Sequence, residues 1–146
     1  MTFAIWKPPT PAYESWVSIS DADRFFKPKC WDLPKIVEAI DAGTLKIELS
    51  TTAQHDFLVD VKFNRSNIVA FLKLLENRHH INSQWCLPPA DGNRHEAHPA
   101  DSYMMGFERF KEIENVRREP HVYIKFAVIE ATNTLMIYSL HHDKED

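Results

Sequence analysis

The chain has 146 residues, of which 44% are hydrophobic and 26% charged, and its formal net charge is −4. This length and composition predict one globular domain, residues 1–146, that can bury roughly two-thirds of its unfolded surface without a disulfide or a metal. The sequence has three glycines and neither of the Gly-rich phosphate-loop motifs, which excludes the nucleotide-binding folds that need those loops. The net negative charge argues mildly against a general nucleic-acid-binding protein.

The cysteines and the first residues of the sequence indicate the cellular compartment of the protein. Cys30 and Cys86 lie far apart and have no CxxC spacing. The first residues, MTFAIWKPP, form no signal sequence, and no apolar run is long enough to span a membrane. We therefore expect a cytoplasmic protein with reduced thiols, and we predict no cofactor.

The N-terminal third combines an extended arm with a short helix. Three prolines within residues 1–14 predict the arm, and Ser20 can open a helical turn. The first well-marked helix is 33–42, because Asp32 is a good N-cap and Gly43 stands at the C′ position.

In the middle of the chain the sequence predicts secondary structure clearly for some segments and ambiguously for others. Alternating apolar residues predict a short strand at 45–49, whereas 50–63 fits either a helix or a strand. A wide apolar face predicts a helix at 66–76. Residues 77–102 are polar and rich in turn residues, which predicts a long loop, and 103–118 returns to a mixed pattern compatible with a helix.

A C-terminal β-hairpin is the clearest prediction. Residues 122–129 alternate with a period of two, a second apolar run covers 135–140, and the polar residues 130–133 between them suit a hairpin loop. Together the patterns predict an α+β domain with a small antiparallel sheet that ends in this hairpin and packs on two to three helices.

The hairpin resembles the closing strands of the MqsR family of toxins, small ribonucleases of RelE-like fold from bacterial toxin–antitoxin pairs. The resemblance lies in His121-Val-Tyr-Ile-Lys-Phe126 and in Leu135-Met-Ile-Tyr-Ser-Leu140, and more weakly in the helices at 33–43 and 67–76. It covers about two-thirds of the chain. It implies a metal-independent endoribonuclease that binds RNA and has a cognate antitoxin as partner.

Position by position, the resemblance places the family's catalytic tyrosine on Tyr123 and its C-terminal catalytic lysine on His141. The lysine after the central helix falls near Asn82, and the catalytic glutamine has no clear counterpart. The chain also departs from the family in its longer N-terminus, in its histidine-rich loop at 93–101 and in its acidity.

Metal-free RNA cleavage needs a base, an acid and cations, and histidine suits both proton-transfer roles. The residue types required are present, and the candidates divide into catalytic and substrate-binding groups. The catalytic candidates are His79, His80, Tyr123 and His141; the substrate-binding candidates are Arg78, Lys125 and Arg109.

Hairpin register decides whether two of these candidates meet. If the turn pairs Glu130 with Asn133 in regular register, His141 falls opposite Val122, on the wrong face of the sheet. A loop of different length, or a bulge, places His141 opposite Tyr123. The nuclease hypothesis requires the second arrangement.

Two other function classes stay open. His95, Glu96, His98 and Asp101 offer metal ligands close together in sequence, although they do not form an HExxH motif and ordinary loop composition explains them better. Alternatively, the chain is a non-enzymatic acidic binding protein, such as an immunity protein, an antitoxin-like protein or a phage-encoded inhibitor, since acidic proteins can mask basic enzymes. Convergence of the basic and histidine side chains would favour the nuclease.

Overall fold

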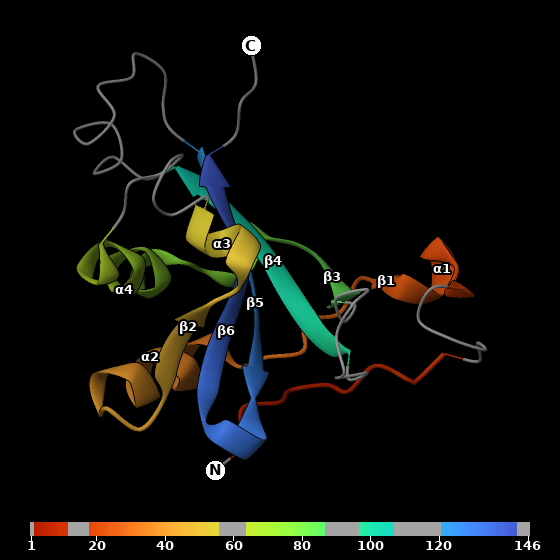
Figure 1. The fold of residues 1–146 in the computed structure, drawn as a ribbon, viewed down its shortest axis with the longest axis horizontal. Helices are drawn as coiled ribbons and strands as arrows, with labels where there is room; N and C mark the ends of the chain where they lie inside the picture. The colour runs from red at the N-terminus through yellow and green to blue at the C-terminus, as the bar shows by residue number, and fades with distance from the viewer. Residues whose placement is uncertain (1, 12–17, 56–63, 87–96, 107–120, 143–146) are drawn as a thin grey trace.

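Six strands form one sheet, seen in a computed structural model that describes residues 2–11, 18–55, 64–86, 97–106 and 121–142 (Figure 1). The order across the sheet is β1-β3-β4-β5-β6-β2. Neighbouring strands run antiparallel except β2 and β6, which are parallel. The strands are β1 (Phe25–Phe26), β2 (Lys46–Leu49), β3 (His80–Cys86), β4 (His98–Gly106), β5 (His121–Ile129) and β6 (Thr134–His142). The predicted α+β class and the C-terminal hairpin are confirmed.

The described helices begin where the sequence offers caps. They are α1 (Asp21–Arg24), α2 (Leu33–Asp41), α3 (Thr51–His55) and α4 (Arg65–Leu74), with 3-10 turns η3 (Asn77–His79) and η4 (Glu130–Thr132). The Asp32 side chain caps α2, which ends before Gly43 at a φ of 76°. Asn64 and Asn67 cap α4 reciprocally. The helices predicted at 33–42 and 66–76 are confirmed to within two residues.

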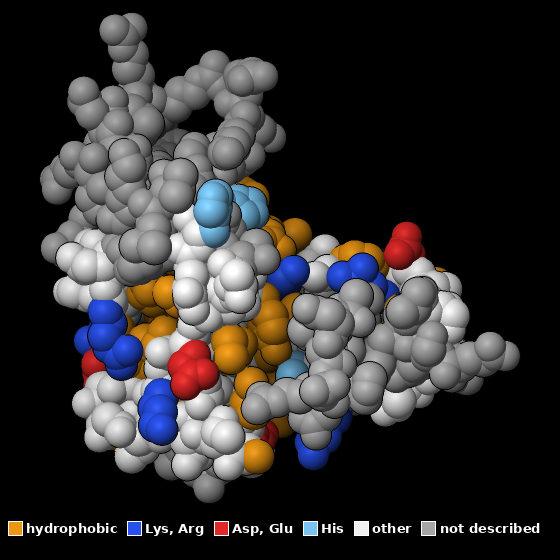
Figure 2. Space-filling view, in the orientation of Figure 1, with side chains coloured by type: hydrophobic (Ala, Val, Ile, Leu, Met, Phe, Trp, Pro, Cys, Tyr) orange, Lys and Arg blue, Asp and Glu red, His pale blue; other side chains and the backbone are white. Residues whose placement is uncertain are grey.

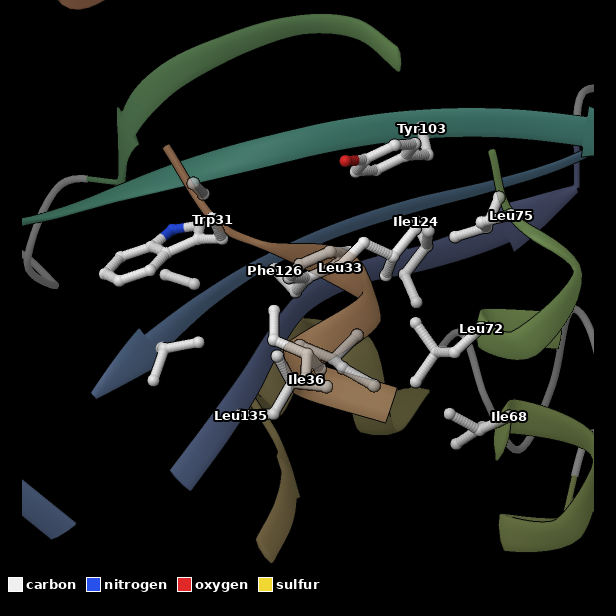
Figure 3. Packing of buried hydrophobic residues seen from close by; sticks show 14 of the residues in the cluster. Trp31, Leu33, Ile36, Ile68, Leu72, Leu75, Tyr103, Ile124, Phe126 and Leu135 are labelled. Atoms are coloured by element: carbon white, nitrogen blue, oxygen red, sulfur yellow. The ribbon is translucent and has the colours of Figure 1, made fainter. Parts of the chain in front are cut away.

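Helices α2 and α4 pack on one face of the sheet, here called the helix-covered face (Figure 3). Ile36 of α2 and Leu72 of α4 meet Ile124 and Phe126 of β5 there, and all four side chains are 1% exposed or less. Burying each such side chain stabilises the fold by about 1.5–3 kcal/mol. Because side chains alternate along a strand, Tyr123 points to the opposite side, here called the open face.

A β-bulge sets the register of the hairpin. Pairing is regular from Ile129 opposite Thr134 to Phe126 opposite Ile137, and it then shifts so that Lys125 faces Ser139. Tyr138 is therefore the extra residue of a bulge. As a result, His141 lies opposite Tyr123, which is the arrangement that the nuclease hypothesis requires.

Two sequence predictions need correction. The region 77–102 is not one long loop, because it contains β3 and the start of β4; residues 87–96 lie outside the described residues. The first residues of 103–118 continue β4 to Gly106 rather than forming a helix, and 107–120 also lie outside. Of the ambiguous stretch 50–63, α3 is helical and 56–63 lie outside.

The arm predicted at 1–14 is extended where it is described, and it is tied down by an isolated bridge between Ala4 and Trp31. Residues 12–14 lie outside the described ranges. Among the described helices, none has the length and apolar character that crossing a membrane requires.

Candidate functional site

Tyr123 and His141 stack on each other across β5 and β6. Their ring centroids lie 4.8 Å apart with an interplanar angle of 16°. The Tyr123 hydroxyl donates a hydrogen bond of 2.9 Å to Oγ of Ser102, a buried residue of β4. Burial raises the pKa of Tyr123, and the bond to Ser102 offsets part of that rise. The phenol therefore stays protonated at neutral pH, where it can donate a hydrogen bond but cannot act as a base.

Two more polar side chains share this face of β5. His121 and Lys125 stand two residues before and after Tyr123, and the burial pattern of β5 alternates accordingly. Lys125 is half-buried and pairs with Ser102 on β4 and with Ser139 on β6. His121 is exposed at the start of the strand. His121 is not among the residues predicted from the sequence, although the period of two that joins it to Tyr123 is a signal for it.

A buried thiol lies on the same face of the sheet, because Cys86 of β3 is opposite His98 of β4. Burial raises the pKa of Cys86 to about 11, while Lys125 and Arg24 lower it to a smaller extent. Cys86 also contributes to the raised pKa values of Tyr123 and Tyr138, after the larger effect of burial. With such a pKa the thiol is protonated at neutral pH and is a poor nucleophile.

In β3, β4 and β5 the open face has a charge opposite to that of the whole chain, whereas Glu48 of the edge strand β2 lies on the same face beyond β6. Asp101 is the sole carboxylate in β3, β4 and β5, and its register with Phe126 places it on the helix-covered face. The open face of these three described strands thus carries Lys125 and histidines but no acid. In the view of Figure 2, hydrophobic side chains gather at the centre, and Lys, Arg and His side chains lie at their border together with Asp or Glu side chains. A surface of this kind suits an anionic ligand that also has flat apolar groups.

His80 belongs to a different cluster on the helix-covered face. Its Nε2 lies 2.9 Å from Oγ of Ser83, which donates to Oδ1 of Asp101 at 2.7 Å. Since the Ser83 proton is directed at Asp101, Nε2 of His80 is the donor to Ser83. The rings of His80 and Tyr103 form an edge-to-face contact, with their centroids 5.4 Å apart. This cluster is separated from Tyr123 by the sheet itself.

Asp101 is the centre of that cluster. Its carboxylate accepts backbone N–H groups of Cys30 and Trp31 at 2.9 and 3.0 Å, besides the Ser83 hydroxyl. Burial, followed by Asp101, raises the pKa of the Cys30 thiol. Because its hydrogen bonds are internal, this buried carboxylate fastens the segment before α2 to the sheet.

His79 and His80 do not lie beside Tyr123 and His141. His80 lies on the opposite face from Tyr123 because β3 begins at His80 and its register carries the ring toward Tyr103. His79 sits in η3, where Nδ1 accepts the Glu76 N–H at 2.9 Å. Arg78 is exposed and forms an ion pair with Glu76 at 2.6 Å.

Three of the remaining candidates lie together, and one lies outside the described residues. Arg109 lies outside the described residues. Tyr123, Lys125 and His141 are together on the open face. Asn82, where the resemblance placed a lysine, pairs with Ser102 on β4.

The metal-site hypothesis gains no support from the geometry. His98 pairs with Cys86 on the open face, whereas Asp101 lies on the helix-covered face and binds backbone N–H groups. His95 and Glu96 lie outside the described ranges. Within those ranges, no group of three His, Cys, Asp or Glu side chains is placed to hold a metal ion.

No protein-family model, curated protein or solved structure matches this chain. The resemblance of the hairpin to MqsR-like toxins therefore stays a prediction from the sequence. The candidate site rests on its own geometry.

Proposed function

We propose that the open face binds RNA and cleaves it without a metal ion, as a toxin-like endoribonuclease. The observation that carries the proposal is the stack of His141 on Tyr123, next to Lys125, on a face where β3, β4 and β5 present no carboxylate. An RNA phosphodiester is anionic and is flanked by flat bases, so it matches both the cation and the exposed ring surfaces.

The reaction that these groups can perform is an internal transesterification. The ribose 2′-oxygen attacks phosphorus, the bond from phosphorus to the 5′-oxygen breaks, and the products are a 2′,3′-cyclic phosphate and a 5′-hydroxyl. One imidazole accepts the 2′-hydroxyl proton and a second donates a proton to the leaving 5′-oxygen. His141 and His121, on neighbouring strands of one face, supply this pair in place of His79 and His80.

Lys125 and Tyr123 fill the other roles. The Lys125 ammonium stabilises the negative charge that builds on the phosphoryl oxygens. Tyr123, fixed by its bond to Ser102, orients the His141 ring and offers an aromatic surface to a base. In this proposal the biological setting is a toxin–antitoxin pair in the cytoplasm, supported by the hairpin's resemblance to MqsR-like toxins, with the cognate antitoxin as partner.

The test uses the purified full chain with a fluorescent RNA of mixed sequence in EDTA. We expect cleavage that ends in a 2′,3′-cyclic phosphate and that stops when a 2′-deoxynucleotide occupies the cleavage position. His141→Ala and His121→Ala should each lower the rate by about 100-fold or more, since each removes a proton-transfer group. His55→Ala, an exposed histidine on α3, is the matched control and should retain the rate.

Two results would contradict the nuclease. One is the absence of metal-independent cleavage, and the other is cleavage that persists in His141→Ala. If the chain neither cleaves RNA nor impairs growth on expression, the non-enzymatic acidic binding protein becomes the better explanation, and the exposed acidic residues outside the open face become the surface to examine.

A further inference from the structure

An exposed aromatic ring and an arginine lie at the far edge of the sheet from His141. The Phe25 side chain is 40% exposed, the most among the phenylalanines that the structure describes. The Arg24 guanidinium carbon stands 5.5 Å from the Phe25 ring centroid, at the distance of a cation–π contact. Nε of Arg24 donates to the Trp85 carbonyl oxygen at 3.4 Å, which ties the arginine to β3.

This pair continues the open face. Phe25 pairs with Gln84, and Gln84 shares its face of β3 with Cys86. Arg24 is held beside this face by its hydrogen bond to the Trp85 carbonyl oxygen, and Cys86, the next residue of β3, lies opposite His98 on the open face. From β1 to β5 there are three inter-strand steps, about 14 Å in total.

Two exposed acids lie in the same short helix as Arg24. Asp21 and Asp23 belong to the first turn of α1; the Asp23 carboxylate accepts the Ser20 hydroxyl, and the Asp23 backbone N–H donates to Oγ of Ser20. Arginine planes and aromatic rings are the surfaces on which unpaired bases stack, and arginine also binds phosphate.

We propose that Arg24 and Phe25 form a second nucleotide subsite, so that the open face holds a single-stranded RNA segment longer than a dinucleotide. A base stacks on the exposed Phe25–Arg24 surface, and the phosphate backbone runs past Lys125 to the Tyr123–His141 pair. This inference rests on the proposed RNA-cleaving function and deepens it, because it assigns the substrate class as unpaired RNA of several nucleotides.

Binding of uncleavable RNA tests the subsite apart from catalysis. The probes are fluorescein-labelled 2′-O-methyl oligonucleotides of three and eight nucleotides, measured by fluorescence anisotropy with the full chain. Phe25→Leu keeps an apolar side chain but removes the ring, and it should weaken binding of the octanucleotide at least fivefold, the effect of losing one stacked base. Binding of the trinucleotide should change by less than about twofold, because a short probe can occupy the Tyr123–His141 end alone.

Conservative variants separate the contributions of stacking and charge to RNA binding from any effect of the substitutions on folding. Phe25→Trp should restore octanucleotide binding, and Arg24→Lys should keep most of it. Arg24→Gln should reduce the slope of log affinity against log salt by about 0.7, the value for one lost phosphate contact with a single strand. Arg65→Gln, which changes an exposed arginine at the start of α4, is the control and should leave both quantities unchanged.

The outcomes distinguish the two proposals. Unchanged octanucleotide binding in Phe25→Leu, or an equal loss with both probe lengths, would overturn the subsite even if the chain cleaves RNA. If Phe25→Leu weakened binding of the octanucleotide but not of the trinucleotide, and the chain did not cleave RNA, the subsite would be supported and the nuclease proposal would be wrong. Failure of both probes to bind would overturn both.

Discussion

The two faces of the sheet each hold a histidine, a serine and a tyrosine, yet the clusters differ in what their polar atoms contact. On the helix-covered face, Asp101 accepts several hydrogen bonds from within the chain, and His80 reaches it through Ser83. On the open face, His141 stacks on Tyr123 beside Lys125, and these side chains are half-exposed. The first cluster holds two segments together, whereas the second can still receive a ligand.

This contrast shows why residue type alone is a poor guide to a site. A histidine next to an acid can serve structure when the acid is fully buried and its hydrogen bonds are internal. A histidine beside a tyrosine can serve chemistry when the pair keeps some contact with water. Substitutions on the two faces should therefore have opposite signatures, with stability lost on one side and binding or activity lost on the other.

The largest effect on stability is expected for Asp101→Ala. The substitution leaves the buried N–H groups of Cys30 and Trp31 without their acceptor, and we expect a loss of about 3–5 kcal/mol in the free energy of unfolding. Urea denaturation followed by circular dichroism measures it. Asp41→Ala, which removes an exposed ion pair with Lys73, should cost less than about 1 kcal/mol. If both variants lost the same free energy of unfolding, Asp101 would have no special structural role.

On the open face, the bond between Tyr123 and Ser102 should contribute moderately. Tyr123→Phe and Ser102→Ala each break the 2.9 Å hydrogen bond, and we expect each to cost about 1 kcal/mol. The double variant tests whether they act together, since a coupling free energy of about 0.5–1.5 kcal/mol is expected for a direct contact. Additive losses would mean that the bond does not contribute in solution.

Tyr103 is the matched tyrosine on the helix-covered face. Its hydroxyl is buried and has no hydrogen-bond partner among the described residues, and Figure 3 shows the ring lying over the core between β4 and the helices. Tyr103→Phe removes this desolvated group, so unfolding free energy should stay unchanged or rise by up to about 1 kcal/mol. A loss of more than about 1 kcal/mol on thermal or urea unfolding would indicate a partner that the described residues do not include.

The smallest effect concerns His80 and pH. Burial lowers the pKa of His80, Asp101 acts in the opposite direction, and Lys29 adds to the lowering. Because the unfolded chain then binds the proton more readily, this contribution to stability is present above a pH of about 6.5 and is lost as the pH falls toward the lowered folded value. We expect the stability difference between wild type and His80→Gln to shrink, by less than about 1 kcal/mol, from pH 7.5 to 5.5. If the stability difference between the two proteins grew on acidification, folding would raise the pKa of His80 instead of lowering it.

The sequence predicted α2, α4, β2 and the β5–β6 hairpin, but it did not predict β1, β3 or β4. Asp32 and Gly43 marked the ends of α2, and the period of two marked β5, because both signals are local. His80 was misplaced because the polar residues after α4 hid a strand whose partner, β4, lies far along the chain. Register across a hairpin is likewise not local, so the alternation of β6 left two positions for His141 open, and the bulge at Tyr138 decides between them.

That bulge matches the order of residues in β6 to the two sides of the sheet. Upstream of Tyr138 each side chain of β6 keeps one orientation, and downstream of it the orientation is inverted relative to an uninterrupted strand. If the same sequence paired through Tyr138 without a bulge, Leu140 would turn outward to solvent and His141 inward to the aliphatic interior. A chain that lacked Tyr138 would need no bulge, because regular pairing would then keep Leu140 opposite Ile124 and His141 opposite Tyr123.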